Sequence, residues 1–183
     1  MGGSGLGIAA LIPVVESMGK GLMGTPLVST VLAAELIRRA GGIAEEDVLE
    51  DISGGCAATV AYLDGSDWGA TNTGVSVDAN GVLSGSKFMV PDAAQATWIA
   101  VVGSDAAGDA VVALVAGRDV AAQAQASHAL IDLTKRASTL DFTGVKAQRV
   151  LSGDKVASAI RDYLLIGALL AAAEAVGSTS ACL

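Results

Sequence analysis

The spacing of apolar residues changes twice along the chain, and these changes limit what it can fold into. Up to about residue 53, apolar residues recur at helical spacing. From about residue 56 to 151 the pattern becomes short β-rich runs between turn residues. From about residue 154 a single alanine-rich helical pattern follows. We therefore predict an α+β fold, with helices before and after a β-rich middle.

Three helices are predicted in the first part. The first covers Ile8 to Met18, where Pro13 either kinks the helix or shifts its start. The second begins near Val28 and closes at Gly41-Gly42, because glycine after cationic residues suits a helix end. A short acidic helix covers Glu45 to Ile52.

Short strands are predicted in the middle part. They cover residues 59–63, 75–77, 82–90, 98–102, 111–115, 129–133 and 140–145. Asn80-Gly81 marks a hairpin between the second and third strands, because both residues tolerate positive φ. No helical pattern separates these runs, so we expect an antiparallel sandwich or barrel and no parallel Rossmann sheet.

The last helix begins near Asp154 and has one broad apolar face. A lone bundle helix cannot bury such a face, and the sequence reaches Leu183 without a capping residue. The chain is therefore expected to be truncated at both ends. The expected domains are a partial N-terminal helical domain (1–54), a middle β-domain (55–152) and the start of a C-terminal helical domain (153–183).

Composition argues against several function classes. The formal net charge is −8, with only two each of Trp, Tyr and Phe, which argues against nucleic-acid binding. Cys56, Cys182 and His128 lie in no metal-ligand spacing, so no protein-borne zinc or haem is expected. Two free thiols suit a reducing cytoplasm, and the sequence shows no basic signal region. The most apolar run, Tyr163–Ala173, is too short to span a bilayer. We therefore expect a cytoplasmic protein outside the membrane.

Four stretches, taken in order, resemble one known family. Residues 2–7 are similar to a "YGGLGL" entry to a helix, and residues 85–98 to a "G-x-K-x-W-I-T-N" strand and its continuation. Residues 132–145 resemble "LD-x-TRR…L-x-F-x-x-V", and residues 172–177 resemble "AAE-x-VG". These motifs are those of acyl-CoA dehydrogenases, which also share the order of helices, β-domain and alanine-rich helix.

The resemblance implies an FAD-dependent enzyme that desaturates an acyl-CoA thioester between its α and β carbons. In this family a glutamate removes the α-proton, a hydride passes from the β-carbon to FAD, and an electron-transfer acceptor takes the electrons. That base belongs to the C-terminal domain and is expected beyond residue 183, so no catalytic residue is assigned within the chain. Glu174 is interpreted as a solvated or ion-paired residue. The family also implies a homo- or hetero-oligomer.

One wall of the flavin pocket is implied within the chain. The family's contact strand "A-x-x-L-T-E-P-x-x-GSD" matches residues 60–67, and the second contact strand matches residues 87–91. The residues expected at FAD are Tyr62, Leu63, Gly65, Ser66, Met89, Val90 and Pro91. Leu63 and Pro91 stand where the family has threonines, so two hydroxyl donors are lost. An ordinary surface turn over residues 64–67 is the alternative.

Other interpretations stay open. A non-catalytic, flavin-poor partner subunit of a heteromeric dehydrogenase would suit the substitutions at Leu63, Met89 and Pro91. A flavin oxidase or hydroxylase on the same fold is a third hypothesis. Lys87 and Arg136 are expected beside the flavin pyrophosphate, the CoA phosphates or surface acids.

Overall fold

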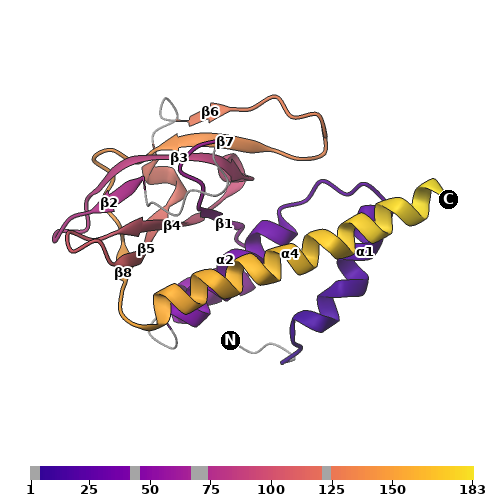
Figure 1. Ribbon diagram of the computed structural model, residues 1–183, viewed down its shortest axis with the longest axis horizontal. Helices are drawn as coiled ribbons and strands as arrows, with labels where there is room; N and C mark the ends of the chain where they lie inside the picture. The colour runs from indigo at the N-terminus through magenta and orange to yellow at the C-terminus, as the bar shows by residue number, and fades with distance from the viewer. Residues whose placement is uncertain (1–4, 42–45, 67–73, 121–124) are drawn as a thin grey trace.

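A computed structural model describes residues 5–41, 46–66, 74–120 and 125–183 of the chain. A layer of helices covers one side of a β-sheet that folds over on itself (Figure 1). The predicted α+β class is confirmed. The helices of the described residues are η1 (Ile8–Leu11), α1 (Ile12–Lys20), α2 (Leu27–Gly41), α3 (Glu46–Ser53), η3 (Ala93–Gln95), η4 (Gly117–Asp119) and α4 (Lys155–Cys182).

Pro13 shifts the start of the first helix. The segment opens as the 3₁₀ turn η1, and Pro13 lies in the first turn of α1. Proline is tolerated there because the first amides of a helix have no intrahelical partner. Of the two effects predicted for Pro13, the shifted start is the one observed.

The strands form one sheet. They are β1 (Ala58–Ala61), β2 (Val75–Val77), β3 (Leu83–Pro91), β4 (Trp98–Ser104), β5 (Ala110–Ala116), β6 (Gln125–Ser127), β7 (Ala137–Asp141) and β8 (Arg149–Leu151). Their order is β6-β7-β3-β2-β4-β5-β8, with β1 beside β4. Most neighbours are antiparallel, as predicted, but β1 and β2 both pair with β4 in parallel. These pairings join strands that are not consecutive in sequence, and short apolar runs do not indicate the direction of a partner.

The predicted hairpin joins β2 to β3. Asp78 caps the turn, its carboxylate accepting hydrogen bonds from the Asn80 and Val82 amides at 2.8 Å each. Gly81 alone takes positive φ (+77°), and the turn sets Val77 opposite Leu83.

The predicted strand at residues 129–133 is wrong. These residues lie in a loop between β6 and β7, and Ile131 and Leu133 are almost fully exposed. The Asp132 carboxylate accepts hydrogen bonds from the Thr134 amide (2.9 Å) and hydroxyl (2.7 Å), which closes a turn in place of a strand. Likewise, the strand predicted at 140–145 ends at Asp141, because the chain turns at Gly144 (φ +80°).

The core has three parts. One lies between the two layers of the folded sheet, where Ile99 and Val101 of β4 meet Leu140 and Phe142. A second lies between the other face of β4 and β5 and the helices α2, α3 and α4. Successive residues of β4 therefore alternate between two buried faces, which explains its unbroken apolar sequence. The third part joins α1, α2 and α4.

α1 and α4 cross with glycines at the contact. A Cβ placed on Gly19 would overlap the backbone carbonyl of Glu174, and one placed on Gly177 would overlap that of Glu16. The two backbones can approach this closely only because neither position carries a side chain. Beside the crossing, Val15 and Met18 of α1 pack on Leu170 of α4.

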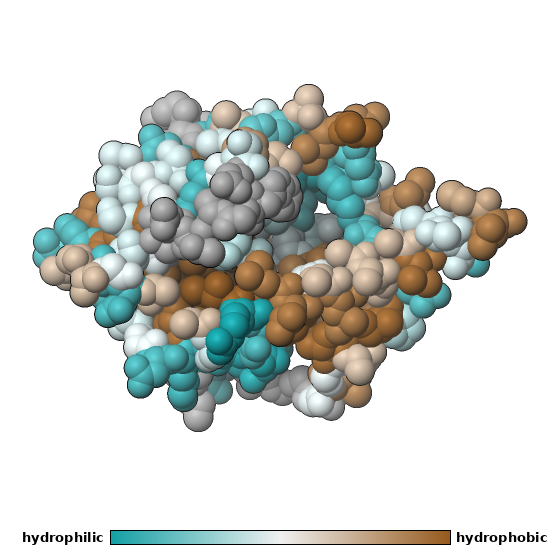
Figure 2. All heavy atoms as spheres, in the orientation of Figure 1, coloured by the Kyte–Doolittle hydropathy of each residue, from teal (hydrophilic) through white to brown (hydrophobic). Residues whose placement is uncertain are grey.

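The outer face of α4 is apolar. Leu164, Leu165, Leu169 and Val176 are all exposed, and Figure 2 shows hydrophobic side chains gathered over this helix. By length and hydropathy alone α4 could cross a membrane; its other face packs against α1 and α2, and 22% of its most apolar window is buried. The expected absence of a membrane contact therefore stays a prediction.

Candidate functional site

The two stretches expected at the cofactor lie side by side. β1 and its pairing with β4 end at Ala61. The residues after Ala61 run beside β3 without forming a strand. The Phe88 amide donates to the Leu63 carbonyl at 2.7 Å, and the Thr59 hydroxyl donates to the Pro91 carbonyl at 2.6 Å. These bonds fasten the β1 segment to β3 at two points, so the structure brings both predicted stretches together.

Lys87 lies beneath this junction. Its side chain is only 1% exposed, and Nζ donates to the Tyr62 carbonyl at 3.0 Å and to the Asp64 carboxylate. Burial lowers the pKa of Lys87, and the Asp64 carboxylate acts in the opposite direction. Of the partners expected for Lys87, the structure gives it an acid, Asp64, whose side chain is half-buried (16% exposed).

An irregularity in β3 turns Met89 and Pro91 away from the core. The pairing of β3 with β7 changes register between Lys87 and Val90, and Met89 has a left-handed backbone (φ +52°). In a regular strand Lys87 and Val90 would face opposite sides, yet both are buried. The extra residue of a β-bulge accounts for this, because it resets the alternation of side chains.

Met89 and Pro91 line a cavity of about 290 Å³ between β3, the loop before β7, and helices α1, α2 and α4. Its apolar lining comprises Met18, Val28, Leu32, Met89, Pro91 and Leu130. This volume lies just below the range of small-molecule sites, which starts at about 300 Å³. The cavity could therefore hold part of a larger ligand rather than all of one.

The charges around this cavity are paired. Asp92 accepts a hydrogen bond from the Ser29 hydroxyl at 2.7 Å, and its other oxygen lies 3.7 Å from Nε of Arg136. Lys135 forms an ion pair with Glu174 of α4, as expected for that glutamate. Because each cation has an acidic partner, the interior favours an apolar group over a charged one.

The other predicted contact residues lie elsewhere. Tyr62, Leu63 and Gly65 are partly buried and Ser66 is exposed, and none of the four lines the cavity. Val90 is buried in the core between the sheet layers, so only its backbone is available to a ligand. Asp67 of the GSD motif lies outside the described residues.

The ring of Tyr62 packs against Tyr163 of α4, with centroids 5.9 Å apart and planes tilted by 51°. Burial raises the pKa of Tyr163 to about 12, and the nearby Tyr62 adds to the rise. This contact links the residue after β1 to α4. The sequence did not predict it, because each tyrosine fits the apolar pattern of its own segment.

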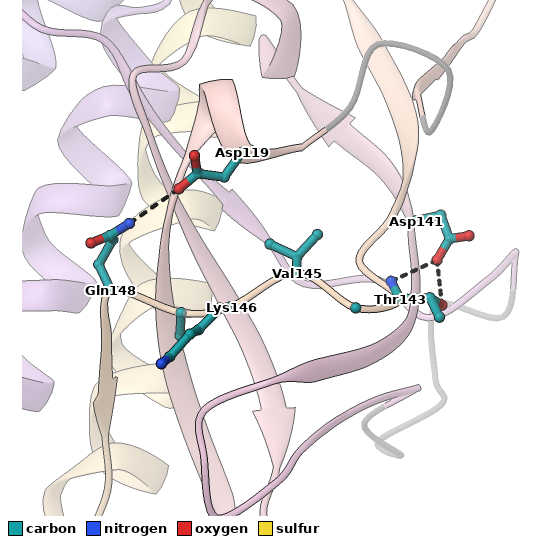
Figure 3. A pocket seen from close by; sticks show the side chains of 8 residues that line it. Asp119, Asp141, Thr143, Val145, Lys146 and Gln148 are labelled. Atoms are coloured by element: carbon teal, nitrogen blue, oxygen red, sulfur yellow. Dashed lines mark hydrogen bonds between the residues drawn. The ribbon is translucent and has the colours of Figure 1, made fainter.

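A larger hollow lies elsewhere on the β-domain, and none of the predicted contact residues lines it; Figure 3 shows the residues that do. Its volume is about 630 Å³, and four of its polar residues form two hydrogen-bonded pairs. Gln148 donates to Asp119 at 3.1 Å, and Asp141 accepts hydrogen bonds from the amide and hydroxyl of Thr143. We prefer the smaller cavity as the candidate site, because only that one includes predicted contact residues.

Among the described residues, no three His, Cys, Asp or Glu side chains come together as metal ligands. His128 is partly buried, with Nε2 2.8 Å from the Thr139 hydroxyl and its ring edge-on to Phe88. The structure thus gives His128 the surroundings of a packing residue.

Comparison with known proteins gives structural matches only. No family model and no curated protein matches the chain. A variant of the Tcur3481-Tcur3483 steroid ACAD matches at 26% identity and a TM-score of 0.79, over 98% of this chain and 49% of its own. The ChsE4-ChsE5 complex from Mycobacterium tuberculosis matches at 25% identity and 0.72, over 96% and 48%. A glutaryl-coenzyme A dehydrogenase in complex with glutaryl-CoA matches at 23% identity and 0.80, over 99% and 51%. The chain spans about half the length of these structures.

Proposed function

This chain has the fold of acyl-CoA dehydrogenases over nearly its whole length, and from that premise we propose that it is part of an FAD-dependent enzyme that desaturates an acyl-CoA. The observation that carries the proposal is the meeting of two stretches far apart in sequence. The family resemblance implies flavin contacts at both the 62–66 segment and the end of β3, and these two stretches lie side by side, joined by the hydrogen bond from the Phe88 amide to the Leu63 carbonyl.

The residues present fit one wall of a binding pocket for FAD. When bound, FAD would accept the hydride that leaves the β-carbon of the substrate. Met89 and Pro91 would offer an apolar surface to the ring, because methionine packs well against aromatic faces. The Tyr62–Ser66 backbone would supply polar contacts, since Leu63 and Pro91 bring no hydroxyl. Each missing hydroxyl bond weakens binding by about 1–3 kcal/mol if its partner atom stays buried and unpaired.

The described residues contribute orientation and shielding rather than proton transfer. Glu174 is paired with Lys135, which makes it unsuitable as the base. We place the base outside these 183 residues. A thioester substrate, an electron acceptor, an oligomer and a cytoplasmic location complete the proposal.

A second function is favoured by the same substitutions. A chain that lacks both threonine hydroxyls would serve as a flavin-poor partner in a heteromeric dehydrogenase, and one solved structure with this fold is itself the ChsE4-ChsE5 complex. The two proposals differ in whether this chain alone retains flavin.

The test is to purify the protein, add FAD, remove free cofactor and record the visible spectrum. Bound flavin whose absorbance is bleached by acyl-CoA supports the enzyme. A colourless protein that acquires flavin only with a second subunit supports the partner, and one that binds none in either setting contradicts both.

A pair of variants locates the flavin. Met89→Asp places a charge on the apolar wall and is expected to weaken FAD binding at least about tenfold, since an unpaired buried charge is costly. Met23→Asp, at an exposed methionine outside the cavity, is the matched control and should bind as the wild type does. Equal binding by both variants would remove Met89 from the site.

A further inference from the structure

Lys87 is unusual among the charged residues that the structure describes, because its side chain is fully buried. Taking an ammonium group out of water costs several kcal/mol, and a buried ion pair is often no more stable than apolar residues of the same size. Stability alone is therefore a poor explanation for a lysine at this position. Its two acceptors suggest another.

Both acceptors of Lys87 belong to one short segment. Nζ bonds the Tyr62 carbonyl and the Asp64 carboxylate, while the next residue of β3, Phe88, donates to the carbonyl of Leu63 between them. Three consecutive residues beyond the end of β1 are thus tied to two consecutive residues of β3. The backbone pairing between β1 and β4 ends at Ala61, so no strand pairing holds this segment.

Asp64 is held from a second side. A Cβ built on Gly74, just before β2, would lie 3.1 Å from Oδ1 of Asp64, so the carboxylate fills the space beside that glycine. The carboxylate therefore has little room to move away from Lys87.

We propose that Lys87 is a positioning residue, which fixes the backbone of residues 62–66 where a cofactor contacts it. This inference rests on the proposed flavin site. Leu63 has no hydroxyl to offer, so this segment can bind a cofactor only through backbone groups and the Ser66 hydroxyl. Such contacts depend on the segment holding one conformation. The buried lysine supplies that constraint where the sheet does not.

The first test uses the protein without cofactor. Lys87→Met keeps an unbranched side chain, slightly shorter than lysine, and removes its hydrogen bonds and ion pair, so amide hydrogen exchange across residues 62–66 is expected to become at least about tenfold faster. Lys155→Met, at an exposed lysine that begins α4, is the matched control and should leave exchange in this segment unchanged. Protection of α2 should stay the same in both variants, which shows that the fold is intact.

The second test measures FAD affinity in the same variants. Lys87→Met should bind FAD about tenfold more weakly than the wild type, and Lys155→Met should bind equally well. Unchanged exchange at 62–66, or faster exchange with undiminished FAD affinity, would overturn the positioning role. A wild-type protein that binds no FAD would instead refute the proposed function, while the exchange result would still decide whether Lys87 orders the segment.

A milder variant tests the same role if Lys87→Met fails to fold. Asp64→Asn leaves Lys87 bonded to the Tyr62 carbonyl and weakens only the charged contact. It is expected to raise exchange at 62–66 by a smaller factor than Lys87→Met. No change in exchange would show that the ion pair does not order the segment.

Discussion

Replacing Gly177 with alanine is expected to force α1 and α4 apart. The added Cβ would overlap the carbonyl oxygen of Glu16 and lie 2.8 Å from its carbonyl carbon and 2.9 Å from the Lys20 amide nitrogen. All of these are backbone atoms, so no side-chain rotation can relieve the clash and the helices must separate. Overpacking of this kind costs about 1–3 kcal/mol. Alanine offsets about 1 kcal/mol of this through its higher helix propensity. The clash with backbone favours the upper part of that range, so we expect a net loss of about 1–2 kcal/mol.

Gly167 of the same helix provides the control. A Cβ there would lie 3.8 Å from Cδ1 of Leu32, which is ordinary contact, so Gly167→Ala keeps the gain in propensity without a clash. It should stabilise the protein by up to about 1 kcal/mol. Urea unfolding followed by circular dichroism would measure both variants, and each kcal/mol corresponds to about 2–4 °C in Tm. If the two variants shift stability in the same direction, the close crossing of α1 and α4 is incorrect.

Three further predictions concern single sites. Because the pKa of Tyr163 rises from 10.0 to about 12, the unfolded chain loses a proton near pH 10 that the folded chain keeps. The free energy of unfolding should therefore fall as pH rises from 10 to 12, by at most about 2–3 kcal/mol. In urea titrations at alkaline pH, Tyr163→Phe should reduce this dependence on pH. An unaltered dependence would contradict the burial of the phenol. Phe142→Ala should cost about 3–5 kcal/mol in urea unfolding, since the ring is fully buried between the sheet layers, and a loss under about 1 kcal/mol would argue against that packing. Ile131→Ser with Leu133→Ser should change the unfolding free energy by less than about 0.5 kcal/mol, because both side chains are in solvent; a large loss would place the loop in the core.

The elements with a strong local signal were predictable from the sequence. β4 and β5 were identified because they are buried on both faces and read as unbroken apolar runs. The 129–133 segment was predicted as a strand because all its residues except Asp132 are apolar, although Ile131 and Leu133 both lie in solvent. β6 and β8 are short and carry little apolar pattern, so their strand conformation depends on partners distant in sequence.

For the proposed flavin wall, the family motifs indicated which chain segments would lie together but not their geometry. Matching short motifs placed residues 62–66 and 89–91 together, and the structure brings both segments to one junction. The register shift in β3 could not be predicted, because the residue with the left-handed backbone is Met89 and not a glycine. The burial of Lys87 was equally hidden, because its partners lie more than twenty residues away. Both features arise from tertiary packing, which overrides local preference.

The contact of α1 with α4 also affects how the protein is made. α1 leaves the ribosome before the β-rich middle, whereas its partner helix α4 follows only after that whole middle has been synthesised. At the usual rate of about 5–20 residues per second, the apolar face around Val15 and Met18 waits roughly 8–30 seconds for its final cover. Contacts between distant parts of a chain also form slowly, so this helix pair is expected to dock late. The nascent chain would then depend on chaperones during that interval.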